Sequence, residues 1–168
     1  MRLARSAVTA LTILACSACI PDYYAFKVDD RVSITAPSDN SKVTLPVRLR
    51  WRVKDFDVVE PGTAVRKGAG YFAVFVDRAP MPPGKDLKWV VRNATDCTAA
   101  GCPDAKYLAT QDIYITTDTQ LLLTDLDEGR KDRRERHTAT IILVDGSGAR
   151  IGESAFDVDF EVRRGEQS

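Results

Sequence analysis

Histidine is scarce in this chain, which has only one, His137, in 168 residues. A Ser-His-Asp triad would need this histidine beside a serine on a sharp strand-to-helix turn. Ser147 instead lies between two glycines in a predicted hairpin turn, and we interpret it as a turn residue. A zinc site needs three or four ligands, and this histidine with Cys97 and Cys102, which we expect to be bonded to each other, does not supply them. The composition therefore predicts neither histidine-based catalysis nor a metal or cofactor site.

An excess of charge of either sign is also lacking, because the chain has 24 Lys and Arg residues and 24 Asp and Glu residues. Removal of an N-terminal signal that contains Arg2 and Arg5 would leave a slight acidic excess. Domains that bind nucleic acid normally carry a clear positive excess. We therefore expect no nucleic-acid partner.

Long apolar runs are absent as well. The run over residues 7–15 is too short to span a bilayer, which takes roughly 20 apolar residues. It follows Arg2 and Arg5, and small residues then lead to Cys16 and Cys19. This layout predicts a cleavable secretory signal over residues 1–15, or alternatively over residues 1–18.

The end of this signal resembles that of bacterial lipoproteins, in which signal peptidase II cuts before a cysteine that is then diacylated. Residues 13–16 have an aliphatic residue at −3 and directly follow the apolar run. Residues 16–19 have better small residues at −2 and −1 and leave an even number of later cysteines. We expect lipidation, for example with palmitate, at Cys16, with Cys19 as the alternative.

The lipoprotein resemblance implies anchoring by an N-terminal lipid on the exported side of a membrane in the bacterial cell envelope. Two other interpretations of these residues stay open. One is ordinary secretion after cleavage by signal peptidase I. The other is a redox or metal-binding CxxC motif at residues 16–19.

Cys97 and Cys102 are separated by four small residues that let the chain fold back on itself. In an oxidising compartment such a pair predicts a disulfide. The loop it closes is short, so we expect it to add less than the ~3 kcal/mol that chain entropy gives for a loop of about 15 residues.

Residues 16–30 show no sustained period and are predicted to be a tether, which spans at most about 50 Å when extended. Its aromatic residues Tyr23, Tyr24 and Phe26 fit a first edge strand, with the lipid interface as the alternative. Residues 31–164 have the length of one ordinary domain, and residues 165–168 form a short tail.

Residues 47–54 give the clearest strand pattern, because four apolar residues alternate with four cations. A period of two places the apolar side chains on one face and the cations on the other. Further strands are predicted over residues 32–36, 71–77, 87–91, 112–116, 120–123, 137–144 and 156–163. No window has a sustained helical period. We predict an all-β fold, an antiparallel two-sheet sandwich of seven or eight strands.

The last quarter of the chain resembles the closing strands of bacterial immunoglobulin-like and fibronectin type III-like domains. The resemblance rests on residues 136–146, where His137 is followed by alternating apolar residues and a Leu-x-Asp-Gly turn, and on the Phe-x-Val ending at residues 160–162. It implies an immunoglobulin-like sandwich and brings no catalytic residues with it.

Two features are candidates for binding. Trp89 follows a turn rich in Pro and Gly, where its flat ring would suit carbohydrate or protein, with packing on the core as the alternative. The second feature is a basic cluster that would suit anionic lipid heads or an acidic partner, with a solvated loop as the alternative. It comprises Arg130, Lys131, Arg133, Arg134 and Arg136.

Together these patterns predict a non-enzymatic, lipid-anchored envelope protein that binds or scaffolds an envelope protein or polysaccharide. Its sites are expected on the loops 60–70, 86–102 and 125–136. The first alternative is a carbohydrate- or peptidoglycan-binding module centred on Trp89. The second is a hydrolase with an undetected site, whose activity should disappear when His137 is replaced by Ala.

Overall fold

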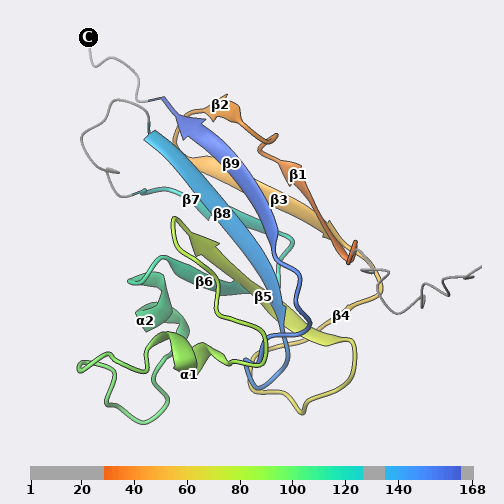
Figure 1. Ribbon diagram of the computed structural model, residues 1–168, viewed down its shortest axis with the longest axis vertical. Coiled ribbons are helices and arrows are strands. Elements are labelled where there is room, and N and C mark those ends of the chain that lie inside the picture. The colour runs from red at the N-terminus through yellow and green to blue at the C-terminus, as the bar shows by residue number, and fades with distance from the viewer. Residues whose placement is uncertain (1–28, 127–134, 164–168) are drawn as a thin grey trace, which may run out of the picture.

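The computed structural model describes residues 29–126 and 135–163 (Figure 1). The predicted signal, Cys16, Cys19, the tether aromatics and the 165–168 tail lie outside the described residues. Within them the chain is mainly β-structure in two sheets, which confirms the predicted all-β class.

Nine strands form the two sheets. The first sheet has the order β1-β3-β7, and the second has the order β2-β9-β8-β5-β4, with β6 also paired to β5. The bounds are β1 (Val32–Ala36), β2 (Ser41–Val43), β3 (Val47–Val53), β4 (Asp57–Val58), β5 (Ala69–Val76), β6 (Ile113–Thr116), β7 (Gln120–Leu123), β8 (Glu135–Val144) and β9 (Phe156–Val162).

Strand β3 has the alternation that its sequence predicts. Its first three apolar residues point inward and are buried, whereas Arg48, Arg50 and Arg52 point outward and are exposed. Pro46 precedes the strand, where the missing N–H costs no ladder hydrogen bond. One face of the first sheet is therefore core and the other is basic.

The two sheets enclose the first hydrophobic core. Leu49 from the first sheet and Phe72 from the second are fully buried. Trp51 packs edge-on against Phe72, with 5.3 Å between ring centroids and 74° between ring planes. Aromatic pairs with this geometry add to the stability gained from burial alone.

Strand β5 is buried on both faces, as its uninterrupted apolar sequence predicts. Its second face is covered by residues 77–112, the connection to β6, which we call the cap. The cap contains the helices α1 (Leu87–Val90) and α2 (Ala105–Ala109). Figure 1 shows both helices beside β5 and β6, on the side away from β1 and β3.

Cap and sheet form a second hydrophobic core. Its buried members are Tyr71, Ala73 and Phe75 from β5, Met81, Leu87 and Leu108 from the cap, Ile113 from β6, and Ile142 and Val144 from β8. The molecule thus has three layers, because the second sheet lies between the first sheet and the cap.

The strand predicted over residues 87–91 is wrong, because this segment forms α1. Asp86 caps this helix and accepts a hydrogen bond from the Trp89 N–H at 3.0 Å, and Asp104 caps α2 through the Tyr107 N–H at 2.7 Å. Helices of four and five residues are too short to show a 3.6-residue period. The capping aspartates are the sequence signal that points to them.

The sandwich is not purely antiparallel, and this part of the prediction is also wrong. Strand β2 runs parallel to β9, and β4 runs parallel to β5. Between β1 and β2 the chain crosses to the second sheet, where the Asn40 N–H donates to the Asp159 carbonyl at 2.7 Å. These two strands have only three and two residues, which is too short for a pattern of alternating side chains to predict them. With them the number of strands is nine instead of the predicted seven or eight.

The predicted disulfide joins Cys97 and Cys102, whose Cα atoms are 5.6 Å apart. It lies in the cap between α1 and α2. Nearby, the Tyr107 hydroxyl donates to the Asp96 carboxylate at 2.7 Å. The disulfide closes a loop within the α1–α2 connection, and the Tyr107–Asp96 hydrogen bond ties this connection to α2.

Replacing Cys97 and Cys102 together by Ser should lower the free energy of unfolding by about 2 kcal/mol, because the bond closes only a short loop. Urea unfolding followed by circular dichroism measures the change. The wild type in reducing buffer is the control and should match the double variant. A loss as large as that of a core truncation would contradict a local role for the bond.

Candidate functional site

The cap is fixed to the hairpin between β8 and β9 by several hydrogen bonds. The Arg150 side chain donates to the Met81 carbonyl at 2.5 Å, and its main-chain N–H donates to the Lys85 carbonyl at 2.9 Å. The Leu87 N–H donates to the Gly148 carbonyl at 3.1 Å. Burial lowers the pKa of the Arg150 guanidinium from its ordinary value. Helix α1 is therefore held in a defined position at this end of the molecule.

Trp89, a predicted binding residue, lies on α1 and is half-buried against the second core. The Arg92 guanidinium stacks on its ring, 3.6 Å from the centroid, and also donates to the Trp89 carbonyl at 2.8 Å. Such a cation–π contact contributes about 0.5–1 kcal/mol at exposed sites. One face of the indole is thus covered by Arg92.

A shallow cavity of about 470 Å³ lies beside Trp89. Its charged lining residues are Lys85, Lys88, Arg92 and Asp86. The carboxylate of Asp86 already caps α1, whereas the three cations are exposed. This basic cavity, defined by Lys85, Lys88, Trp89 and Arg92, favours a negatively charged group.

Of the predicted basic cluster, Arg130, Lys131, Arg133 and Arg134 lie outside the described residues. Arg136 is described, is exposed at the start of β8, and lines a different cavity from Trp89. Trp89 and Arg136 therefore do not share a site.

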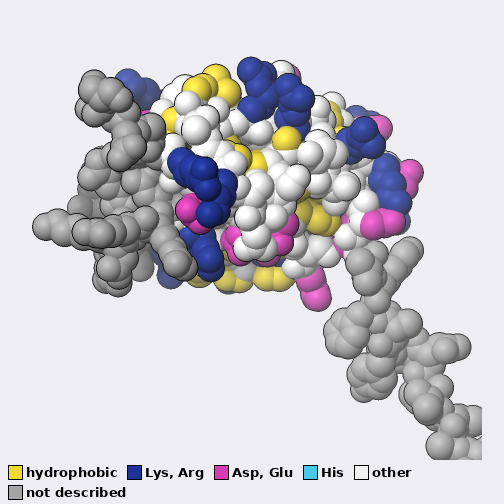
Figure 2. Space-filling model, turned by 90° about the horizontal axis from the view of Figure 1, so that it is seen from above, with side chains coloured by type: hydrophobic (Ala, Val, Ile, Leu, Met, Phe, Trp, Pro, Cys, Tyr) yellow, Lys and Arg dark blue, Asp and Glu magenta, His cyan; other side chains and the backbone are white. Residues whose placement is uncertain are grey.

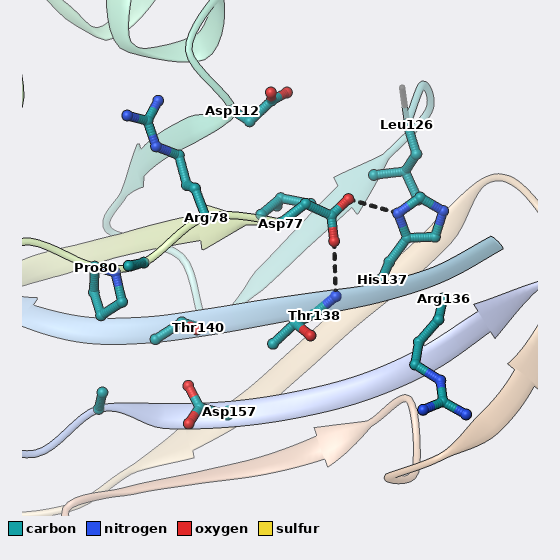
Figure 3. Close-up of a pocket in the computed structure, with 13 residues that line it drawn as sticks. Asp77, Arg78, Pro80, Asp112, Leu126, Arg136, His137, Thr138, Thr140 and Asp157 are labelled. Atoms are coloured by element: carbon teal, nitrogen blue, oxygen red, sulfur yellow. Dashed lines mark hydrogen bonds and ion pairs between the residues drawn. The ribbon is translucent and has the colours of Figure 1, made fainter. Parts of the chain in front are cut away.

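The cavity beside Arg136, of about 750 Å³, is the larger of the two, and the sequence pattern did not predict it (Figure 3). It lies where β5 ends and β8 begins, with Asp157 of β9 on another wall. Figure 3 shows Asp77 and His137 pointing toward each other across these two strands.

Asp77 and His137 form a close pair in this cavity. One oxygen of the Asp77 carboxylate, Oδ2, lies 2.6 Å from His137 Nδ1. The other, Oδ1, accepts a hydrogen bond from the Thr138 N–H at 2.8 Å. His137 is only 2% exposed and stacks on Phe160 at 5.7 Å. Asp77 has a φ of 53°, a left-handed conformation that Asp tolerates better than most residues.

This arrangement ties the ends of several strands together. Both carboxylate oxygens of Asp77 are engaged, and the nearby Thr138 hydroxyl donates to Asp159 at 2.6 Å. These contacts join the end of β5 to the beginning of β8 and to β9. The sequence signal was the isolated His at a strand start, but its partner is 60 residues away and could not be identified from spacing.

Replacing Asp77 by Ala should lower the free energy of unfolding by about 2 kcal/mol more than replacing Asp55 by Ala, because the His137 imidazole and the Thr138 N–H lose their partner. Asp55 is the matched control, since it is exposed and has a φ of 52°. Chemical denaturation of both variants measures the difference. Equal losses would mean that the pair contributes nothing to stability.

In residues 29–126 and 135–163 no group of three or more His, Cys, Asp or Glu side chains is placed to hold a metal ion. No helix in that part of the chain is long and apolar enough to cross a membrane. No protein-family model matches the chain, and neither the curated proteins nor the solved structures contain a match to it.

Proposed function

We propose that this chain is a non-enzymatic lipoprotein of the bacterial cell envelope that binds an acidic protein partner through its cap. The observation that carries the proposal is the basic cavity on α1, held rigidly against the sandwich. The fold, the anchor and the partner are supported by separate features.

An immunoglobulin-like fold is supported by the strand order. The sequence β1-β3-β7 in one sheet and β9-β8-β5 in the other corresponds to strands A-B-E and G-F-C of immunoglobulin domains. The helical cap takes the place of a simple connection after the third of these strands in the second sheet. This assignment agrees with the resemblance of residues 136–146 and 160–162.

The lipid anchor is supported by the N-terminal sequence. The short apolar run, the small residues before Cys16 or Cys19, and the tether over residues 16–30 fit a processed lipoprotein. Val32, the first residue of β1, lies two residues after the end of this tether. The disulfide in the cap fits an oxidising compartment outside the cytoplasm.

A binding role for the cap is supported by its size and by its side chains. It is a long connection that carries a disulfide and two helices and packs on the second sheet through the second core, and such elaborated loops often carry function. Tryptophan and arginine dominate the binding energy of many protein interfaces. Lys85 and Lys88 add positive charge that would steer an acidic partner toward Trp89.

The alternatives have less support. A sugar ring would stack on the indole of Trp89, but Arg92 covers one face of the ring and the side chain is half-buried against the second core. A histidine-based hydrolase would need its imidazole open to a substrate, but His137 is only 2% exposed and its ring stacks on Phe160. Protein binding therefore accounts for the geometry better than carbohydrate binding or catalysis does.

The test is affinity purification of the full-length protein from chemically cross-linked cells, compared with the variant Lys85→Gln/Lys88→Gln/Arg92→Gln. We expect an envelope protein to be recovered with the wild type and reduced at least tenfold with the variant, because three cations are lost from one interface. The matched control is Arg66→Gln/Lys67→Gln/Lys106→Gln, which removes the same charge outside the basic cavity.

The control variant should recover the partner as well as the wild type does. Equal recovery with all three proteins would contradict binding at the cap. Retention on purified peptidoglycan, together with a change in Trp89 fluorescence, would instead support the carbohydrate alternative.

A further inference from the structure

The outward face of the first sheet carries a row of arginines. Arg48, Arg50 and Arg52 occupy every second position of β3 and are exposed. Alternate residues on a strand are about 6.5 Å apart, so the three side chains leave the same face of the sheet in one row along β3. We call this surface the arginine face.

The neighbouring strands add no negative charge to this face. Ser33 of β1 lies opposite Arg52, while Gln120 and Leu122 of β7 lie opposite Arg50 and Arg48. Arg48 contacts Gln120 at 3.4 Å, which is a neutral partner. The strands that flank the arginine face therefore carry no acidic residue on it, and the one acid in the same register is Asp118, in the turn before β7, which forms no ion pair with Arg52.

Some other described cations form ion pairs with acidic residues. Arg31, Lys54 and Arg66 each lie within 4 Å of a carboxylate, those of Asp29, Asp30 and Asp57 respectively. In the view of Figure 2, too, several Lys and Arg side chains lie beside Asp or Glu. Three adjacent arginines without an ion pair to any described carboxylate thus distinguish the arginine face from these paired sites.

We propose that the arginine face docks on the anionic phospholipid surface of the membrane to which the protein is anchored. An open sheet face fits an extended charged surface, and guanidinium groups bind phosphate oxygens in pairs. The proposal rests on the proposed lipid anchor, because the tether enters β1, the strand beside β3. Each arginine near such a surface contributes about fivefold to binding.

This orientation agrees with the position of the cap. The cap covers the opposite face of the second sheet, so it is on the far side of the sandwich from the arginine face. With the arginine face on the membrane, the basic cavity beside Trp89 lies on the cap side of the sandwich, away from the lipid.

The test uses the unacylated full chain, Cys16→Ser/Cys19→Ser, with vesicles of phosphatidylglycerol and phosphatidylcholine or of phosphatidylcholine alone. Phenylglyoxal modification, quantified by peptide mass spectrometry, reports the exposure of each arginine. We expect Arg48, Arg50 and Arg52 to be protected on the anionic vesicles only, while Arg66 reacts equally on both. Equal reaction of all four arginines on both vesicles would overturn the proposal.

A charge variant gives the second measurement. In this unacylated chain, Arg48→Gln/Arg50→Gln/Arg52→Gln should weaken partitioning onto the anionic vesicles by roughly 100-fold, at about fivefold for each charge. The control Arg66→Gln/Lys67→Gln/Lys106→Gln removes the same charge elsewhere and should change it less than about twofold. Equal losses for both variants would show a net-charge effect and overturn the proposal.

The two hypotheses fail separately in this design. Because this variant carries no acyl group, a lack of arginine protection on anionic vesicles would reject the docking of the arginine face without affecting the hypothesis of a lipid anchor. Absence of an acyl chain on the native protein rejects the anchor and leaves the vesicle result as it stands.

Discussion

Replacing Phe72 by Ala should lower the free energy of unfolding by about 4 kcal/mol. Phe72 is fully buried at the middle of β5, where its ring contacts Trp51 from the first sheet and Phe56, at centroid distances of 5.3 and 6.0 Å. The substitution removes these ring contacts and leaves a cavity that a strand paired on both sides cannot close. Typical domains have only about 5–15 kcal/mol of stability, so a large fraction would be lost.

Guanidinium unfolding, monitored by the fluorescence of Trp51 and Trp89, measures the effect of Phe72→Ala. The matched control is Phe56→Ala, because Phe56 is only partly buried at the edge of the same core. It should lose about half as much, since less apolar area leaves water there. Similar small losses in both variants would contradict a tightly packed core between the sheets.

Replacing Leu108 by Ala should lower the free energy of unfolding by about 3 kcal/mol. Leu108 is fully buried on α2, between the cap and the outer face of the second sheet. Its loss leaves a cavity in the second core, which is shared between the cap and β5, β6 and β8. We expect a single cooperative transition, because cap and sandwich bury their apolar surfaces against each other.

Leu122→Ala is the matched control for this prediction. Leu122 is 45% exposed on β7, so the same chemical change should alter stability by less than about 0.5 kcal/mol. Equal effects of the two substitutions, or a separate early transition in Leu108→Ala, would mean that the cap is a loosely attached appendage. The proposed binding role of the basic cavity would then lose its rigid support.

In the proposed arrangement, the three layers place two binding faces on opposite sides of the protein. The arginine face on β3 is suited to anionic lipid, and the basic cavity on α1 is suited to an acidic protein. Between them, the second sheet is buried on both sides by the first sheet and by the cap. This arrangement explains how an anchored domain would hold a partner site away from the membrane.

The periodicity of the sequence predicted the strands that alternate or are apolar throughout. The alternation in β3 and the continuous apolar run of β5 can be read from the sequence, because the polarity of each residue indicates whether its side chain is buried. The burial of both faces of β5 could be predicted for the same reason, but the sequence did not show that the cap covers its second face.

The cap could not be predicted, because its order depends on contacts with distant strands. Leu87 begins a helix of four residues, and its partners in the second core come from β5 and β8. The pairing of Asp77 with His137 likewise joins residues 60 positions apart. Trp89 was identified as a binding candidate, but its stacking with Arg92 becomes visible only in three dimensions.

Mass spectrometry of the N-terminal peptide, taken from protein purified out of bacterial membranes, tests the central claim most directly. A lipid-anchored envelope module predicts a mature chain that starts at Cys16, or alternatively at Cys19, with diacylglycerol on its sulfur. A chain that retains Met1, with no acyl group and with Cys97 and Cys102 reduced, would contradict both the anchor and the proposed location.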